Sequence, residues 1–237
     1  MNPTQRQRGK HPNDDKLFGA KWPPIFKDAL DDHSFLLERG YGTTSSLEIV
    51  GNRYRLNKRQ RQALRRMSVA PSDVEQRQTK ACSLPAMKGA TVAVDGFNLL
   101  ILLENVFSGA YIFHSLDGCL RDISSVHGSY KHIKQTGEAI KLIGDVFQTL
   151  EVAHVKWFLD QPISNSGRLR AFLEEISAQN SFPWEVELCF DPDKVLAVSP
   201  HIVVSADGWV IDQAERWFNM GAYLVEHYLP DANIFRV

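Results

Sequence analysis

The sequence of 237 residues contains only three cysteines, and their spacing argues against two kinds of stabilising site. Cys82, Cys119 and Cys189 lie far apart, and none belongs to a C-x-x-C pair. This spacing disfavours both a disulfide framework and a structural zinc site. We therefore expect three thiols in a reducing compartment, the cytoplasm.

Long apolar runs are also absent. The longest, such as Leu99 to Leu103, are far shorter than the roughly 20 residues that a membrane-spanning helix needs. The N-terminus is polar and shows no apolar core followed by a cleavage site, so we expect neither a secretory signal nor a membrane partner. A hydrophobic content of 43% and a charged content of 23% are typical of a globular protein.

The charges that are present divide the chain into two parts. Residues 1–88 hold 17 Lys and Arg against 9 Asp and Glu, whereas residues 89–237 hold 10 against 19. A basic segment joined to an acidic one suggests two tasks, one that holds a polyanion and one that holds cations. Attraction between the two halves across an interface is the alternative.

The basic part divides further by pattern. Residues 1–20 are polar and predict a disordered or loosely attached tail. Residues 21–67 show helical apolar spacing with stops near Gly40 and a possible N-cap at Asn57, which predicts a small helical domain. Residues 68–88 hold two prolines among polar residues and predict a linker.

From residue 89 to residue 237 short apolar runs alternate with helical segments, which indicates an α/β domain with a parallel sheet. Helices are expected on both faces of that sheet, because its strands are apolar throughout. One helix is expected over residues 117–125. The five expected strands comprise residues 91–94, 154–159, 184–190, 202–205 and 234–235.

Three of the expected strands run into an acid: Asp95, Asp160 and Asp207. Ligands bind at the carboxyl ends of parallel strands, so these acids would meet if their strands are neighbours. Their mutual repulsion would then require a cation, and oxygen ligands favour Mg²⁺ or Mn²⁺, one or two ions. Each Asp could instead be a helix N-cap or part of an Asp-Gly turn. Asp212, and Asp117 with Asp122, are further candidate ligands.

Two stretches carry a resemblance to a known family. Residues 92–98 (VAVDGFN) resemble the first strand of PIN-like and NYN-like nuclease domains, and residues 203–212 (VVSADGWVID) resemble their fourth strand and next helix. The whole chain resembles the group called domain of unknown function 434, in which a helical domain precedes a PIN-like one. The stretches that carry this second resemblance are residues 53–64, 117–122, 126–130 and 162–169.

The resemblance implies a five-stranded sheet in the order 3-2-1-4-5, which places strands one, two and four side by side. It also implies a metal-dependent nuclease. In that mechanism Asp95, Asp160, Asp207 and Asp212 are the catalytic acids. A further acid between the first two strands would complete the site, and Asp117, Asp122, Glu104 and Glu138 compete for this place. Ser205 belongs to the Ser-x-Asp pattern of the fourth strand.

Several other polar residues could support such a site. Asn98 could orient Asp95 through its amide, and His127 could move a proton or contact phosphate, although a lone histidine is commonly structural. Ser164 and Asn165 lie at an expected helix start where backbone N–H groups can hold an anion, and Arg168 could add a contact. An ordinary helix cap with a surface arginine is the alternative.

The basic segment is rich in arginine around one expected helix. Such a density of positive charge suits phosphate backbones, although a solvated helix face or a patch docked on the acidic domain explains it equally well. The candidate nucleic-acid-binding residues here are Arg53, Arg55, Lys58, Arg59, Arg61, Arg65 and Arg66.

From these patterns and the resemblance we expect a metal-dependent hydrolase of phosphodiester bonds, with RNA favoured over DNA as the partner. The basic helical domain would aid nucleic-acid binding. The alternative is an RNA-binding protein that retains the acidic site without catalysis. The aromatic stretches at 217–218 and 223–228 could serve a homodimer or the core.

Overall fold

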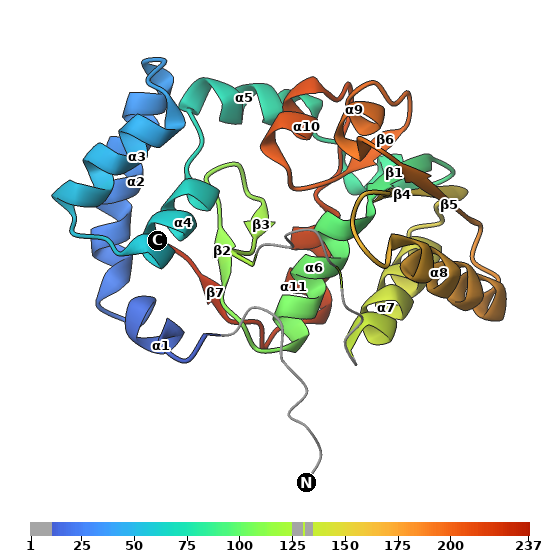
Figure 1. The fold of residues 1–237 in the computed structure, drawn as a ribbon. Helices are drawn as coiled ribbons and strands as arrows, with labels where there is room; N and C mark the ends of the chain where they lie inside the picture. The colour runs from blue at the N-terminus through green and yellow to red at the C-terminus, as the bar shows by residue number, and fades with distance from the viewer. Residues whose placement is uncertain (1–10, 125–129, 131–134) are drawn as a thin grey trace, which may run out of the picture.

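The computed structural model describes residues 11–124, 130 and 135–237 and has two regions (Figure 1). Helices of the N-terminal third form one end of the molecule, and parallel strands with their helices form the other. The candidate proton shuttle His127 lies outside the described residues. Within the described ranges, no helix combines the length and the apolar character needed to cross a bilayer.

The helical region forms as its apolar spacing predicts. Phe26, Ala29 and Leu30 lie on one face of the longest helix and are buried. Asn57 caps the last helix, because its side chain accepts the backbone N–H of Gln60 while the Gln60 side chain accepts that of Asn57. The helices are α1 Asp14–Leu17, α2 Trp22–Glu38, α3 Thr43–Arg53 and α4 Lys58–Met67.

The described part of the N-terminal tail is not loose, which corrects the expectation for residues 11–20. Phe18 is 3% exposed and packs in the core of the helical region. Asp14 is buried and forms an ion pair with Arg59 of α4, with 2.5 Å between Oδ1 and Nε. An aromatic anchor and a buried charge pair therefore attach this segment to the helices.

The segment expected as a linker, residues 68–88, is also folded. It contains helix α5, Pro71–Lys80, and the short 3₁₀ helix η1, Leu84–Met87. Proline at the first turn of α5 is compatible with a helix because that position needs no N–H donor. Arg77 of α5 and Met87 of η1 are both buried, so this segment packs against the rest of the chain.

The α/β region is built on a four-stranded parallel sheet in the order β5-β4-β1-β6. In chain order these are the first four strands that the sequence predicts, and their arrangement is 3-2-1-4. The central strand β1 places Asp95 opposite Phe158 of β4. The strands are β1 Thr91–Asp95, β4 His154–Asp160, β5 Trp184–Cys189 and β6 Ile202–Val204.

Helices cover both faces of this sheet, as expected. Val92 and Val94 of β1 belong to one core, and Ala93 between them belongs to another, because successive side chains of a strand point to opposite faces. The first core includes α6 Gly96–Phe107, α7 Gln135–Thr149, α8 Ser166–Asn180 and α11 Met220–Tyr228. The second includes α9 Pro192–Ala197 and α10 Gly208–Gln213.

The expected fifth strand does not join the main sheet, so the expectation of a five-stranded sheet was wrong. Strand β7 (Ile234–Phe235) pairs with β2 (Ile112–His114) in a separate three-stranded sheet. Its Phe235 packs on Phe113 and Phe26 in the core of the helical region, which explains the displacement. The third strand, β3 (Leu120–Arg121), occupies part of the segment expected as a helix at 117–125.

Candidate active site

The carboxyl ends of the parallel strands form an acidic cleft of about 370 Å³. The lining also includes a basic side chain, Arg66, which belongs to α4 of the helical region. Three of its acids are those that the sequence placed at strand ends, since β1, β4 and β6 are neighbours. The aspartates that line this cleft are Asp95, Asp122, Asp160, Asp193 and Asp207.

Asp95 ends the central strand and is only 7% exposed. Its Oδ1 accepts the backbone N–H of Asn98 at 3.2 Å, so it caps helix α6. Its Oδ2 accepts the hydroxyl of Ser205 at 2.9 Å. The capping role and the position in the cleft therefore coexist in one side chain.

The pKa of Asp95 is raised to about 7, first because burial penalises the charged carboxylate. The nearby charges of Asp193 and Asp207 raise it further, whereas the hydrogen bonds from Ser205 and Asn98 oppose the shift. A carboxylate with this pKa can gain or lose a proton near neutral pH.

Other carboxylates of the cleft are perturbed in the same direction. Burial, and then the charge of Asp191, raise the pKa of Asp160. Burial, followed by Asp207, Asp191 and Asp160, raises that of Asp193. The Oδ1 atom of Asp160 is buried without a hydrogen-bond partner in the described part of the chain. Burial and repulsion between neighbouring carboxylates therefore both disfavour the charged form of these acids.

Ser205 and Asn98 join the two strand ends that carry Asp95 and Asp207. The Ser205 hydroxyl donates to Asp95 and accepts the backbone N–H of Asp207 at 3.0 Å. The side-chain oxygen of Asn98 accepts the N–H of Ala206 at 3.0 Å. The Asn98 amide thus supports the loop after β6, and its backbone N–H, rather than the amide, contacts Asp95. Asp207 in turn caps α10.

The structure does not bring Asp117 and Asp212 to the cleft, which corrects their assignment to its rim. Nε and Nη2 of Arg77 bind the two carboxylate oxygens of Asp212 at 2.6 and 2.9 Å. Arg77 Nη1 and Arg121 Nη2 both bind Oδ2 of Asp117, at 2.5 and 2.7 Å. These two acids are already paired with guanidinium groups.

The pKa of Asp117 reflects this pairing. Burial alone would raise it, but the charges of Arg121 and Arg77 hold it well below its ordinary value. Among the acids that competed to complete the site, Asp122 is the one in the cleft. Glu104 is fully buried and accepts hydrogen bonds from the hydroxyls of Tyr130 and Thr136.

Asp122 lies in the cleft close to Arg66 and Ser124. Burial raises the pKa of Asp122, whereas the charge of Arg66 and the Ser124 N–H, whose nitrogen lies 2.6 Å from Oδ1, lower it. Arg66 is therefore close enough to act electrostatically on an acid of the cleft.

Asp193 is the residue of the cleft that the sequence interpretation missed. It belongs to α9, which begins directly after β5, with Asp191 as its N-cap and Pro192 in its first turn. The pattern Asp-Pro-Asp after the third strand was a usable signal, because an N-cap followed by proline predicts a helix start. The apolar run that predicts the third strand extends to Phe190, and the helix after it has only six residues, Pro192–Ala197.

The residues expected to bind an anion at the start of α8 have other contacts. The Asn165 side chain donates to the backbone oxygen of Tyr130 at 2.7 Å, and the oxygen of Ser164 accepts the Tyr130 N–H. Asn165 has a positive φ of 72° and makes no side-chain cap bond. Arg168 is exposed on α8. Ser164 and Asn165 thus attach Tyr130 to the start of the helix.

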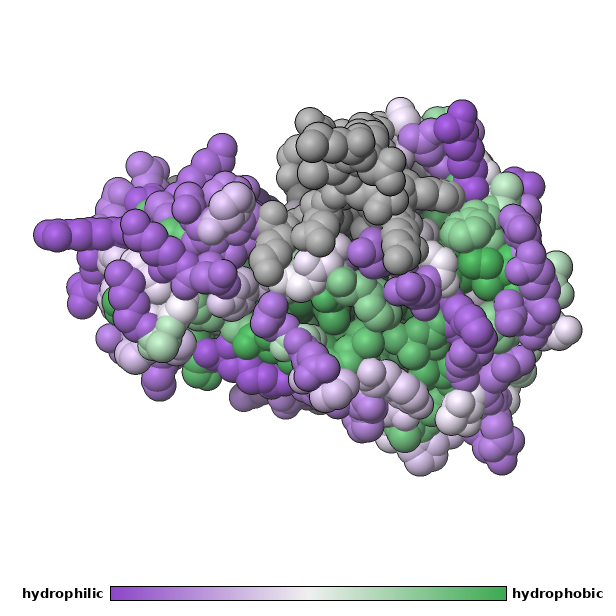
Figure 2. All heavy atoms as spheres, turned by 90° about the horizontal axis from the view of Figure 1, so that it is seen from below, coloured by the Kyte–Doolittle hydropathy of each residue, from purple (hydrophilic) through white to green (hydrophobic). Residues whose placement is uncertain are grey.

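The expected nucleic-acid-binding residues fall into two groups. Arg53, Arg59 and Arg61 have partners inside the helical region: Arg53 and Arg59 pair with acids, and Arg61 binds backbone and amide oxygens. The remaining residues of α4 and its approach are exposed: Arg55, Lys58, Arg65 and Arg66. Figure 2 shows the molecule from below, with the helical region at the left. Hydrophilic residues cover most of the visible surface of that region.

Within residues 11–124, 130 and 135–237, no three His, Cys, Asp or Glu side chains are grouped closely enough to hold a metal ion in this conformation. The acids of the cleft are nevertheless all oxygen donors, and one of them has a buried oxygen without a partner. The chemistry of the donors therefore fits a hard divalent cation.

Comparison with known proteins matches the two regions separately. The family model described as Domain of unknown function (DUF5616) matches residues 84–223, and the model described as Protein of unknown function (DUF434) matches residues 25–80. An uncharacterized protein of Methanocaldococcus jannaschii is 29% identical over 192 residues, which cover 78% of this chain and 92% of that protein. No solved structure shows significant similarity.

Proposed function

The chain belongs to the family described as Domain of unknown function (DUF5616), and we propose that the acidic cleft in the matched region hydrolyses phosphodiester bonds. In this proposal the α/β region is a PIN-like nuclease domain that depends on Mg²⁺ or Mn²⁺. The substrate is RNA rather than DNA, and the basic helical region aids its binding.

The observation that carries the proposal is the convergence of Asp95, Asp160 and Asp207 from three neighbouring strands into one cleft. Asp122 and Asp193 add two more carboxyl groups. Burial and mutual repulsion raise the pKa of several of these acids, which disfavours the folded protein at neutral pH. Proteins keep such unfavourable arrangements where they serve binding or catalysis.

Asp95, Asp160 and Asp207 would hold the cation, with Asp122 and Asp193 beside it. A preformed cage of three ligands is not a requirement for Mg²⁺, which retains waters and is held by one or two carboxylates together with substrate phosphates. When bound, the cation would neutralise the scissile phosphate and lower the pKa of a water molecule.

The residues of the chain itself position the carboxylate of Asp95 and the substrate. Ser205 fixes Oδ2 of Asp95, and the Asn98 N–H fixes Oδ1. A bound cation would keep Asp95 ionised, because a positive charge beside a carboxyl group lowers its pKa. Arg66, at the border of the cleft, can donate two parallel hydrogen bonds to a phosphate group of the substrate.

The test is to incubate labelled single-stranded and structured RNA with the protein in Mn²⁺, Mg²⁺ or EDTA. The native chain should cleave only with a divalent cation, and Asp95→Asn should not cleave. Asp231→Asn, which changes an exposed aspartate outside the cleft, is the matched control and should cleave like the native chain. RNA that stays intact under every condition would overturn the proposal.

The second candidate is an RNA-binding protein that uses the acidic cleft without cutting. The exposed Arg65 and Arg66 at the end of α4 favour binding and do not by themselves require chemistry. The same experiment separates the two candidates, because a binder retains RNA that is never shortened.

A further inference from the structure

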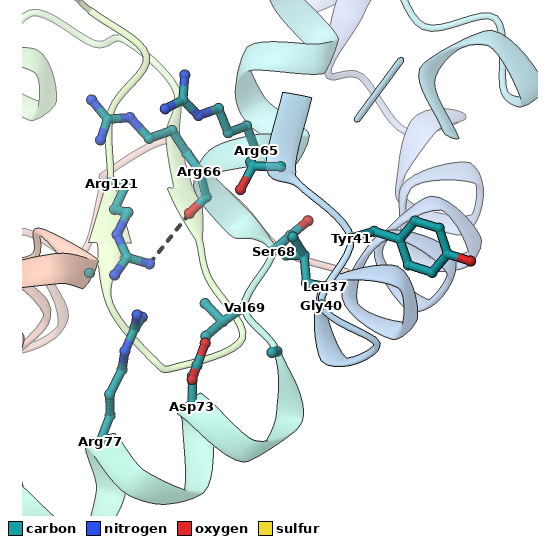
Figure 3. A pocket seen from close by; sticks show the side chains of 13 residues that line it. Leu37, Gly40, Tyr41, Arg65, Arg66, Ser68, Val69, Asp73, Arg77 and Arg121 are labelled. Carbon is teal, nitrogen blue, oxygen red and sulfur yellow. Dashed lines mark hydrogen bonds between the residues drawn. The ribbon is translucent and has the colours of Figure 1, made fainter. Parts of the chain in front are cut away.

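A second pocket, of about 380 Å³, lies between the two regions of the molecule. It is lined by the turn between α2 and α3, the end of α4, helix α5 and the start of α10. We call it the arginine pocket, because its charged lining consists of Arg65, Arg66, Arg77, Arg121 and Asp73. Figure 3 shows these side chains around the cavity.

Two of the four arginines are already neutralised. Arg77 and Arg121 share Asp117 between them, and Arg77 also binds both oxygens of Asp212. Arg121 further donates from Nε to the backbone oxygen of Ala206 at 2.7 Å. These two side chains are buried and held in place by several bonds each, so they form a fixed wall of the pocket.

Arg65 and Arg66 differ from this pair. Both are exposed, and neither guanidinium makes an ion pair or hydrogen bond with the residues that the structure describes. In Figure 3 both side chains extend toward the side on which Arg121 lies. Asp73 is the only acid in the described lining, and the charge of Asp122 in the acidic cleft reaches Arg66, so Arg65 is the guanidinium most available to an anion in the pocket.

The backbone beneath these two arginines belongs to the last turn of helix α4. The backbone oxygen of Arg66 accepts a long hydrogen bond from Arg121 Nη1 at 3.4 Å, drawn as a dashed line in Figure 3. Just after the helix, the hydroxyl of Ser68 donates a hydrogen bond to the backbone oxygen of Leu64 at 2.7 Å. Because both residues lie on a formed helix, binding a ligand mainly orders their side chains, which limits the entropic penalty.

Arg66 also lines the acidic cleft, so the arginine pocket and the cleft share a side chain. We propose that the arginine pocket binds a phosphate of a nucleic-acid strand that flanks the phosphate in the acidic cleft. The strand passes from the pocket to the cleft along Arg66. The identity of the ligand as a polynucleotide rests on the proposed function, whereas the recognition of a phosphate rests on the pocket itself.

The chemistry of the pocket suits this ligand. A guanidinium offers parallel N–H donors that match two oxygens of one phosphate, and Arg65 and Arg66 offer two such groups. The volume falls in the range of small-molecule sites and is sufficient for a nucleotide unit. Contacts to phosphate carry no base information, so binding here fixes the position of the strand rather than its sequence.

The test measures binding without catalysis. A labelled, short single-stranded RNA is titrated with the full chain in EDTA at several salt concentrations, and the dissociation constant is compared among variants. Arg65→Ala should weaken binding by about tenfold or more, because it removes a charged donor from a phosphate. It should also reduce the slope of log K against log salt by about 0.7.

Two further variants make the result specific. Arg65→Lys keeps the charge, so it should retain the native salt slope while it binds more weakly, since the paired donors are lost. Arg170→Ala removes an exposed arginine of α8 that lies outside the pocket, and it should bind like the native chain. A native affinity and salt slope in Arg65→Ala would overturn the assignment of the pocket.

Failure of this inference and failure of the proposed function give different results. If binding in EDTA depends on Arg65 while RNA is never cut in Mn²⁺, the assignment of the arginine pocket is supported and the proposed nuclease activity is overturned. If cleavage depends on Asp95 while the binding affinity is the same with and without Arg65, the proposed nuclease activity is supported and the assignment of the arginine pocket is overturned.

Discussion

The acidic cleft makes the stability of the protein depend on pH in a way that Asp95→Asn should reveal. Asparagine has the shape of the protonated carboxyl group and can remake its contacts. Its oxygen can accept the Asn98 N–H, and asparagine caps helices as well as aspartate does. Its amide can donate to the Ser205 hydroxyl, which rotates to accept.

The magnitude follows from the pKa of Asp95, which folding raises from 3.8 to about 7. The folded state binds this proton more tightly than the unfolded state, so stability is greatest below the unfolded pKa and is lost as pH rises. This contribution to stability is lost completely once the pH exceeds the folded pKa. The difference between a pKa of 3.8 and one of about 7 corresponds to about 4 kcal/mol. The asparagine variant carries no such charge.

The assay is urea unfolding in EDTA, with the midpoints of the native chain and of Asp95→Asn measured across pH. At about pH 8 the variant should be more stable by about 2 to 4 kcal/mol, and by about pH 5 the difference should shrink to about half or less. Asp231→Asn, an exposed control, should follow the native chain. A variant that is less stable at every pH would refute the reasoning and leave only the helix cap.

Three further substitutions test the packing around the site, each measured as a urea midpoint. Arg77→Ala should lower stability by about 3 to 5 kcal/mol, because it leaves the buried carboxylate of Asp117 with one guanidinium fewer; an unchanged midpoint would contradict this account. Asn57→Ala should lower stability by about 1 kcal/mol through loss of the capping box. Gly96→Ala should lower it by about 1 to 3 kcal/mol, since the new methyl would lie 2.5 Å from Leu159 Cδ2.

The parts of the fold that could be predicted depend on local signals. The capping box at Asn57 and the apolar strands that end in Asp95 and Asp160 are encoded within a few neighbouring residues. The order of the four parallel strands required the resemblance to PIN-like domains, because no local pattern states which strands are neighbours. Once that order is known, the acids at the strand ends must share one edge of the sheet.

The parts that could not be predicted depend on contacts between distant residues. Asp212 is separated from Arg77 by 135 positions and Asp117 by 40, so the sequence gives no sign that one arginine pairs with both. Phe235 leaves the main sheet because it packs against aromatic rings of the helical region. Tertiary contacts decided both outcomes.

The salt bridges of Arg77 also bear on how this chain can change during evolution. The two family models meet between residues 80 and 84, and Arg77 lies on one side of that boundary while Asp117 and Asp212 lie on the other. A gene that retained only the second segment would leave Asp212 without its arginine and Asp117 with Arg121 alone. Separation of the two segments at the family boundary should therefore destabilise the second one.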